Sequence, residues 1–198
     1  MNTKKFRVGR VLRASTRSFV IGCAVMRPDI PAFGSFAWAE GLAPGSAIYG
    51  LIYDVSVEDD AFVRQFISAN PSEEAVLDQR ENRQIPIEVS VLATGCGDGD
   101  HIYHRLPPQP PVTLDWLYQC SREEVCAFTA KLDYFRLVLE TREIPADELL
   151  AASLRSAAAA RPVEERERFL IDAGRELARL LASDPTRLEG LLRRLRPT

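Results

Sequence analysis

The chain has 198 residues, a formal net charge of −3 and an apolar fraction of 46%. This length suits one domain or two small ones, and the composition excludes a disordered or fibrous chain. No run approaches the roughly 20 apolar residues that a membrane-spanning helix needs, so we expect a soluble globular protein.

The first half of the sequence is typical of short β-strands separated by turns. The expected strands combine β-branched and apolar residues, and the fifth alternates strictly in polarity. Gly9, inside the first of them, predicts a bulge or a barrel corner. The expected strands span residues 6–14, 18–26, 33–40, 47–57, 85–94 and 101–106.

A helical insertion is expected between the fourth and fifth strands, over about residues 59–80. Asp59 or Asp60 is a suitable N-cap, and the apolar residues between Phe62 and Ile67 recur with helical spacing.

A proline-rich segment at residues 107–112 continues neither kind of structure, because proline lacks the amide donor of a sheet and breaks a helix interior. We interpret it as a stiff linker of polyproline character, and the alternative is a docking motif for an aromatic groove. It divides the chain into a β domain, residues 1–106, and a helical region, residues 113–198.

Helices are indicated after the linker, because apolar residues recur there every three or four positions. Ser121 and Glu124 form a capping box for a first helix that continues to Leu139. Asp184 and Pro185 provide an N-cap and a first helical residue for the last. The leucine-rich stripes need a covering surface: they form a small bundle, cover the β domain, or meet another subunit.

The β half resembles the HAS barrel, a small β-barrel shared by HerA-type DNA-translocating ATPases and the subunits of rotary ATP synthases. The resemblance rests on Gly9-Arg10-Val11-Leu12 and on the strand from Ile48 to Val55. It implies an α+β fold with a small N-terminal barrel that acts as an assembly collar, here followed by an all-α C-terminal region. In those ATPases a nucleotide-binding core follows the barrel, and this chain departs from the family pattern there.

Several kinds of active site are excluded by the composition. Lysine occurs only at Lys4, Lys5 and Lys131, and none follows a glycine, as the lysine of a phosphate-binding loop does. Any catalytic pair that needs histidine must use His101 or His104, and no nucleophile elbow is present. Without a visible acid–base constellation, we expect a non-enzymatic protein that needs no cofactor.

One segment combines several side chains that can bind a transition metal. Its spacing matches no recognised zinc motif, and Gly-Asp-Gly-Asp is ordinary turn chemistry, so we predict an exposed turn here. The four cysteines of the chain form no Cys-x-x-Cys pair, which favours free thiols in a reducing, cytoplasmic compartment. The metal-site alternative would use Cys96, Asp98, Asp100, His101 and His104.

A basic stripe occupies the first 28 residues, which contain no acid. It is a candidate for contact with nucleic-acid phosphates, and the alternative is a solvated or subunit-interface face paired with acids such as Glu73 and Glu74. We interpret it as strand rather than signal peptide, because its arginines are interspersed with apolar residues and no cleavage site follows. The cations are Lys4, Lys5, Arg7, Arg10, Arg13, Arg17 and Arg27.

A second group of cations lies at the C-terminus, where arginines complement a helix dipole or form a docking tail. They are Arg187, Arg193, Arg194 and Arg196. Together these features predict a protein-interaction or assembly module that associates through barrel surfaces and leucine-striped helices, with a protein partner or with itself. The alternative is a nucleic-acid-associated factor that works with a separate HerA-type ATPase.

Overall fold

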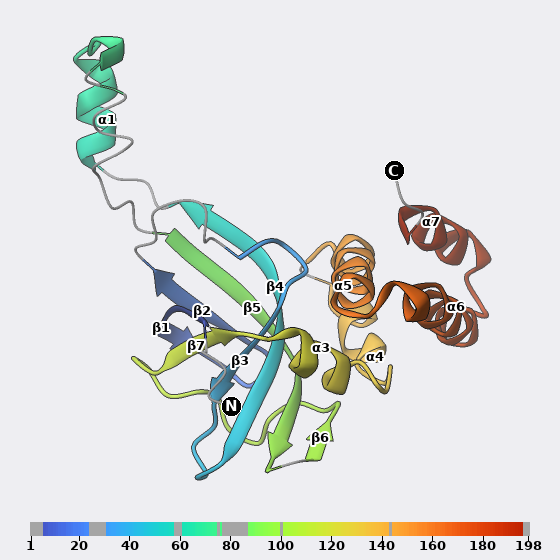
Figure 1. Cartoon of the computed structure of the whole chain (residues 1–198). Helices are drawn as coiled ribbons and strands as arrows, with labels where there is room; N and C mark the ends of the chain where they lie inside the picture. Colours follow the sequence, from blue (N-terminus) through green and yellow to red (C-terminus); the bar gives the residue numbers. More distant parts are fainter. Residues whose placement is uncertain are drawn as a thin grey trace.

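The computed structural model describes residues 6–23, 31–57, 61–74, 76, 87–99, 101–142 and 144–195. Six antiparallel strands close into a barrel, and helices from the C-terminal part of the chain pack on one side of it (Figure 1). The predicted fold class, α+β with a barrel and a helical C-terminal region, is confirmed.

The barrel is a closed ring of strands with one hairpin strand outside it. The strands are β1 (Phe6–Ala14), β2 (Ser18–Cys23), β3 (Phe36–Glu40), β4 (Ser46–Val57), β5 (Ile87–Asp98), β6 (His101–Tyr103) and β7 (Trp116–Gln119). The order round the ring is β1–β2–β5–β4–β3–β7, and β7 pairs with β1 to close it. β6 pairs with β5 as a short hairpin.

The predicted strands are present, with β3 and β6 shorter than expected. The insertion contains helix α1 (Ala61–Ser68), which stands away from the barrel in Figure 1. Its suggested N-caps, Asp59 and Asp60, lie outside the described residues, as do residues 24–26 and 85–86 of the expected strands.

β7 is a strand that the sequence analysis did not expect, because it follows the proline-rich segment. Its Trp-Leu-Tyr run has high β propensity, but four residues are too few to show a period of two. β7 nevertheless pairs with both β1 and β3, so the barrel is complete only with residues from beyond the prolines.

Alternating apolar side chains fill the barrel. On β5, Val89 and Val91 are fully buried in the core within the ring, whereas Leu92 belongs to a second core outside it. The predicted alternation is present, but both sides of β5 are buried along most of the strand. The register of β1 against β7 shifts between Arg7 and Gly9, so the bulge predicted at this glycine is present.

The second core lies between the outer face of the barrel and the helices. These are α3 (Arg122–Phe128), α4 (Phe135–Leu139), α5 (Ala146–Ala160), α6 (Val163–Leu180) and α7 (Pro185–Leu195). Phe36, Leu51 and Leu92 of the barrel share this core with Leu150 and Leu177 of the helices. The sequence left three surfaces that could cover the leucine-rich stripes: other helices, the β domain or another subunit. The first two apply, because the helices pack on one another and on the barrel.

The expected first helix is divided into α3 and α4. The capping box at its start is present, with the Ser121 amide bonded to the Glu124 carboxylate. α3 has its C-cap at Thr129, where the Arg161 guanidinium donates to the Thr129 carbonyl at 3.3 Å and to its hydroxyl at 2.7 Å. A side chain from beyond α5 thus occupies acceptors at the end of α3, and the apolar spacing alone could not show this interruption.

Candidate interaction surface

The outer face of β1 lies on the side of the barrel that the helices leave uncovered. In the ring, β4 is three strands from β1 in either direction. The outward side chains of β4, Tyr49, Leu51 and Tyr53, pack in the helical core. β1 is therefore opposite the helical layer, as Figure 1 shows.

Two arginines of the predicted basic stripe are held against this outer wall by an indole. The guanidinium carbons of Arg7 and Arg10 lie 4.9 and 4.0 Å from the ring centroid of Trp116. Arg10 also donates from Nη1 to the Leu114 carbonyl at 2.6 Å. Within the described part of the chain, neither arginine forms an ion pair with a carboxylate. The wall thus presents two fixed positive charges.

The rest of the basic stripe does not continue this surface. Arg13 forms a bidentate ion pair with Glu88, with Nη1–Oε1 at 3.0 Å and Nη2–Oε2 at 2.9 Å, so its charge is compensated within the barrel. Glu88 was not among the acids suggested from the sequence. Arg17 is exposed at the turn before β2. Lys4, Lys5 and Arg27 lie outside the described residues.

Exposed apolar side chains lie beside the two arginines. Leu12 is 46% exposed, Val112 42% and Leu114 63%. The turn that carries Val112 and Leu114 is bonded to β1, because Leu114 N–H donates to the Val11 carbonyl and Val11 N–H donates to the Asp115 carbonyl, both at 2.9 Å. We define the β1 face as Arg7, Arg10, Leu12, Val112, Leu114 and Trp116.

Neither Leu114 nor Trp116 was a candidate in the sequence analysis. The aromatic β-prone residues of β7 were a signal for a strand, but nothing in the sequence marks which of them meets the arginines. The β1 face is built from two segments about 100 residues apart, and only the register of β1 against β7 brings them together.

The residues of the suggested metal segment point to different environments. Asp98 pairs with His101 across the β5–β6 hairpin, Cys96 is buried on β5, and Asp100 lies outside the described residues. Among the described residues, no three metal-ligating side chains come together.

His104 lies apart from the other residues of this segment, at the junction between the barrel and the helices. Its Nε2 lies 3.0 Å from the Phe128 carbonyl, and its ring packs on Phe128 and Tyr134. Burial lowers the pKa of His104, although the hydrogen bond to Phe128 opposes the effect. In the neutral ring, Nε2 donates this bond.

A cleft of about 440 Å³ separates the barrel from the end of α4. Its floor includes Leu92, Ala93 and Leu137, while its charged residues, Arg17, Glu140 and Arg142, are exposed. Among its described lining residues, no hydroxyl is hydrogen-bonded to a carboxylate base, so they assign no reaction to the cleft.

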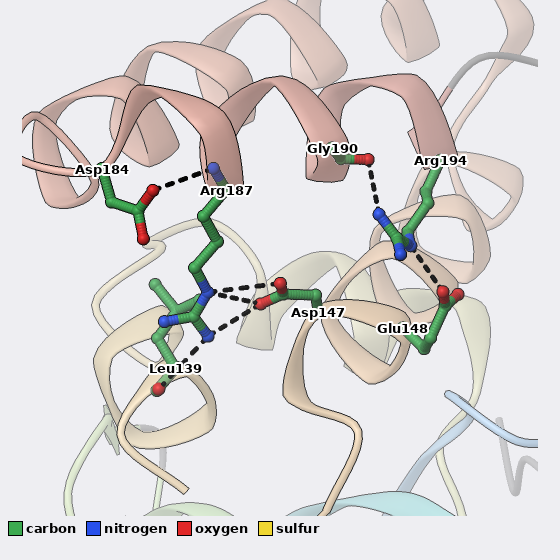
Figure 2. Close-up of polar contacts among 7 residues, drawn as sticks. All are labelled: Leu139, Asp147, Glu148, Asp184, Arg187, Gly190 and Arg194. Carbon is green, nitrogen blue, oxygen red and sulfur yellow. Dashed lines mark hydrogen bonds and ion pairs between the residues drawn. The ribbon is translucent and has the colours of Figure 1, made fainter. Parts of the chain in front are cut away.

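Two of the C-terminal arginines hold α7 on α5 (Figure 2). Arg187 bonds both carboxylate oxygens of Asp147, at 2.9 and 3.2 Å from Nε, which raises the pKa of Arg187. Arg194, two turns further along α7, pairs with Glu148. The Arg187 amide donates to Asp184 Oδ1 at 3.0 Å, which confirms the predicted N-cap. Arg193 and Arg194 lie in the last turn of α7, as the helix-dipole interpretation expects, whereas Arg187 lies in the first turn and pairs with α5 instead. Arg196 lies outside the described residues.

Within the described ranges, no helix combines the length and the hydropathy that a membrane crossing requires. Comparison with known proteins finds no family model that matches this chain and no curated protein that is similar to it in sequence.

Proposed function

We propose that this chain is a non-enzymatic interaction module that binds protein through the outer wall of its barrel, at the β1 face. The observation that carries the proposal is the combination on this face of exposed leucines with two arginines stacked on Trp116. Arginine and tryptophan are enriched at the energetic centres of protein interfaces, and grouped exposed apolar side chains mark interaction sites.

The packing of the helical region limits the surfaces that remain for a partner. Its stripe residues, such as Leu149, Leu154 and Leu177, are fully buried within the chain. They are therefore used in holding the helices to one another and to the barrel. Association through helices would have to use their outward faces, whereas the β1 face is open on the opposite side.

A test of this function compares proteins recovered with the native chain and with a variant of the β1 face. Leu12→Thr with Leu114→Asn removes the exposed leucines and suits the strand and the turn. The expected result is loss of specific partners, or of copies of the chain, after chemical crosslinking in the source cells. Leu42→Ser is the matched control, because Leu42 is also an exposed leucine, at 60%, on a turn. Equal recovery with all three proteins would refute the proposal.

A second candidate function is contact with nucleic acid, as an accessory to a separate HerA-type ATPase. The absence of carboxylate partners for Arg7 and Arg10 within the described residues favours it. Its test is binding to duplex DNA at low salt, where phosphate contacts are strongest. Affinity that weakens with salt and with Arg7→Ser/Arg10→Ser would support it, and no binding at low salt would exclude it.

A further inference from the structure

Leu114 has a backbone conformation that its residue type disfavours. It is the third residue of the turn from Val112 to Asp115, in which Asp115 N–H donates to the Val112 carbonyl at 3.2 Å, and its φ is +73°. Glycine or asparagine is usual at such a position, and a bulky side chain there is an outlier. The side chain is 63% exposed, so packing within the chain does not explain the leucine. Its side chain is available for contact with another molecule.

The outward side of α6 has a matching chemistry. Phe169, Ala173 and Leu177 turn toward the core. Outside that buried stripe, Val163 in the first turn is 70% exposed and Ile171 is 48% exposed. Glu164 and Glu167 lie with them, since residues three, four and seven positions apart share one helix face. Neither glutamate forms an ion pair with a described residue. We define the α6 face as Val163, Glu164, Glu167 and Ile171.

The β1 face and the α6 face are complementary but lie apart. One presents two arginines beside leucines, and the other presents two glutamates beside a valine and an isoleucine, with the exposed Arg168 at its edge. They cannot meet within one chain, because β1 is opposite the helical layer and α6 packs beyond α5 (Figure 1). They can meet between two copies. Such a contact joins different surfaces, so it continues from copy to copy until a ring closes or a filament grows.

We propose that copies of this chain associate head to tail, with the β1 face of one copy seated on the α6 face of the next. This inference rests on the proposed function, because it names the partner of the same β1 face. Leu114 is the apolar anchor of the contact, and Arg7 and Arg10 meet Glu164 and Glu167 across it.

The strain at Leu114 can be tested on the separate chain. In dilute solution, Leu114→Gly or Leu114→Asn relieves the left-handed backbone, and we expect Tm to rise by about 2–4 °C. The same variants lose association at high concentration. Stability and assembly therefore move in opposite directions if the leucine is kept for contact. A lower Tm in both variants would show that the side chain serves the fold instead, which overturns its role as anchor.

The head-to-tail geometry is tested by mixing two variants that each lack one face. One carries Leu12→Thr and Leu114→Asn, and the other carries Val163→Gln and Ile171→Gln. By sedimentation equilibrium, the native chain is expected to grow in mass with concentration, while each variant alone stays a monomer. An equimolar mixture is expected to give a one-to-one heterodimer and nothing larger, because only one intact pair of faces remains. A mixture that stays monomeric would refute the contact.

Charge reversal tests the polar half of the contact. Arg7→Glu/Arg10→Glu and Glu164→Arg/Glu167→Arg are each expected to abolish association, and the chain that carries all four changes is expected to associate again. Arg105→Glu is the matched control and should assemble normally, because Arg105 also stacks on an aromatic ring, that of Tyr103, but lies on neither face. Failure of the fourfold variant to recover would overturn the pairing of these charges.

The two proposals fail differently. If the native chain is a monomer at every concentration, but partners recovered from its source are lost with the β1-face variant, the head-to-tail contact is wrong and the proposed function stands. If the β1-face variant changes neither mass nor recovery, both are wrong. Binding of duplex DNA by a chain that remains monomeric would instead assign the β1 face to nucleic acid.

Discussion

His104 joins the β5–β6 hairpin to the helical core through one polar contact. It follows β6 on the barrel side, yet its ring lies 4.6 Å from that of Phe128 and 5.4 Å from that of Tyr134, between centroids. Among the charged groups near it, Asp133 raises its pKa and Lys131 lowers it, but burial is the largest influence and the net shift is downward. The folded protein therefore holds this histidine neutral at pH values where the unfolded chain binds a proton.

This shift predicts a loss of stability in mild acid. Below the ordinary histidine pKa of 6.5, the unfolded state binds a proton that the folded state does not. The free energy of unfolding is then expected to fall as pH decreases from that value toward the lowered folded pKa, by at most about 1.4 kcal/mol per pH unit. Above it, this contribution is constant.

Urea unfolding between about pH 5 and 8 measures the effect. His104→Gln should flatten the dependence near pH 6, while His101→Gln, at an exposed position on β6, should leave it in place. If the native chain and His104→Gln have parallel profiles, the histidine is not held neutral by the fold.

At the scale of elements, the sequence predicted correctly those strands and helices in which apolar residues recur over many positions or in which neighbouring residues pair. Residues 87–91 of β5 alternate in polarity in the sequence, although the strand is buried on both sides, and the capping box of α3 is a local pairing that the sequence states directly. β7 has only four residues, and its place depends on β1 and β3, which lie far from it in sequence. For the same reason, only part of the β1 face was predicted. The basic stripe contained Arg7 and Arg10, whereas Leu114 and Trp116 reach them only through the pairing of β1 with β7.

Gly9 illustrates a local signal with a tertiary cause. A methyl group added there would collide with the Gly22 carbonyl oxygen and would lie 2.8 Å from Cβ of Cys23 and from Cγ2 of Ile21. These are backbone and core atoms of β2, which have no room to retreat. Gly9→Ala is therefore expected to destabilise the protein by about 1–3 kcal/mol.

Gly174→Ala provides the contrast, because its added methyl would lie 3.7 Å from Leu192 and alanine favours a helix interior. This variant should gain up to about 1 kcal/mol. Thermal and urea unfolding of both variants measures the difference. Equal stability of Gly9→Ala and the native chain would mean that the bulge in β1 absorbs the methyl group.

At the scale of the whole molecule, the barrel and the helices share their walls. Phe36, Leu51 and Leu92 stand on barrel strands, but their side chains form the floor of the helical core. The inward side chains of the same strands, such as Ile52 and Val91, fill the barrel. Each of these strands therefore contributes to two cores at once, and the barrel depends on residues from both sides of the proline-rich segment.

This sharing predicts how shortened chains behave. A chain of residues 1–111 loses β7, so β1 and β3 each lose a neighbour and present open edges. It also exposes the floor of the helical core. We expect it to aggregate or to show no cooperative transition by circular dichroism. A chain of residues 1–183 loses only α7 and keeps the closed ring, so it should unfold cooperatively at a lower Tm. A soluble 1–111 chain that melts cooperatively would show that the barrel closes without β7.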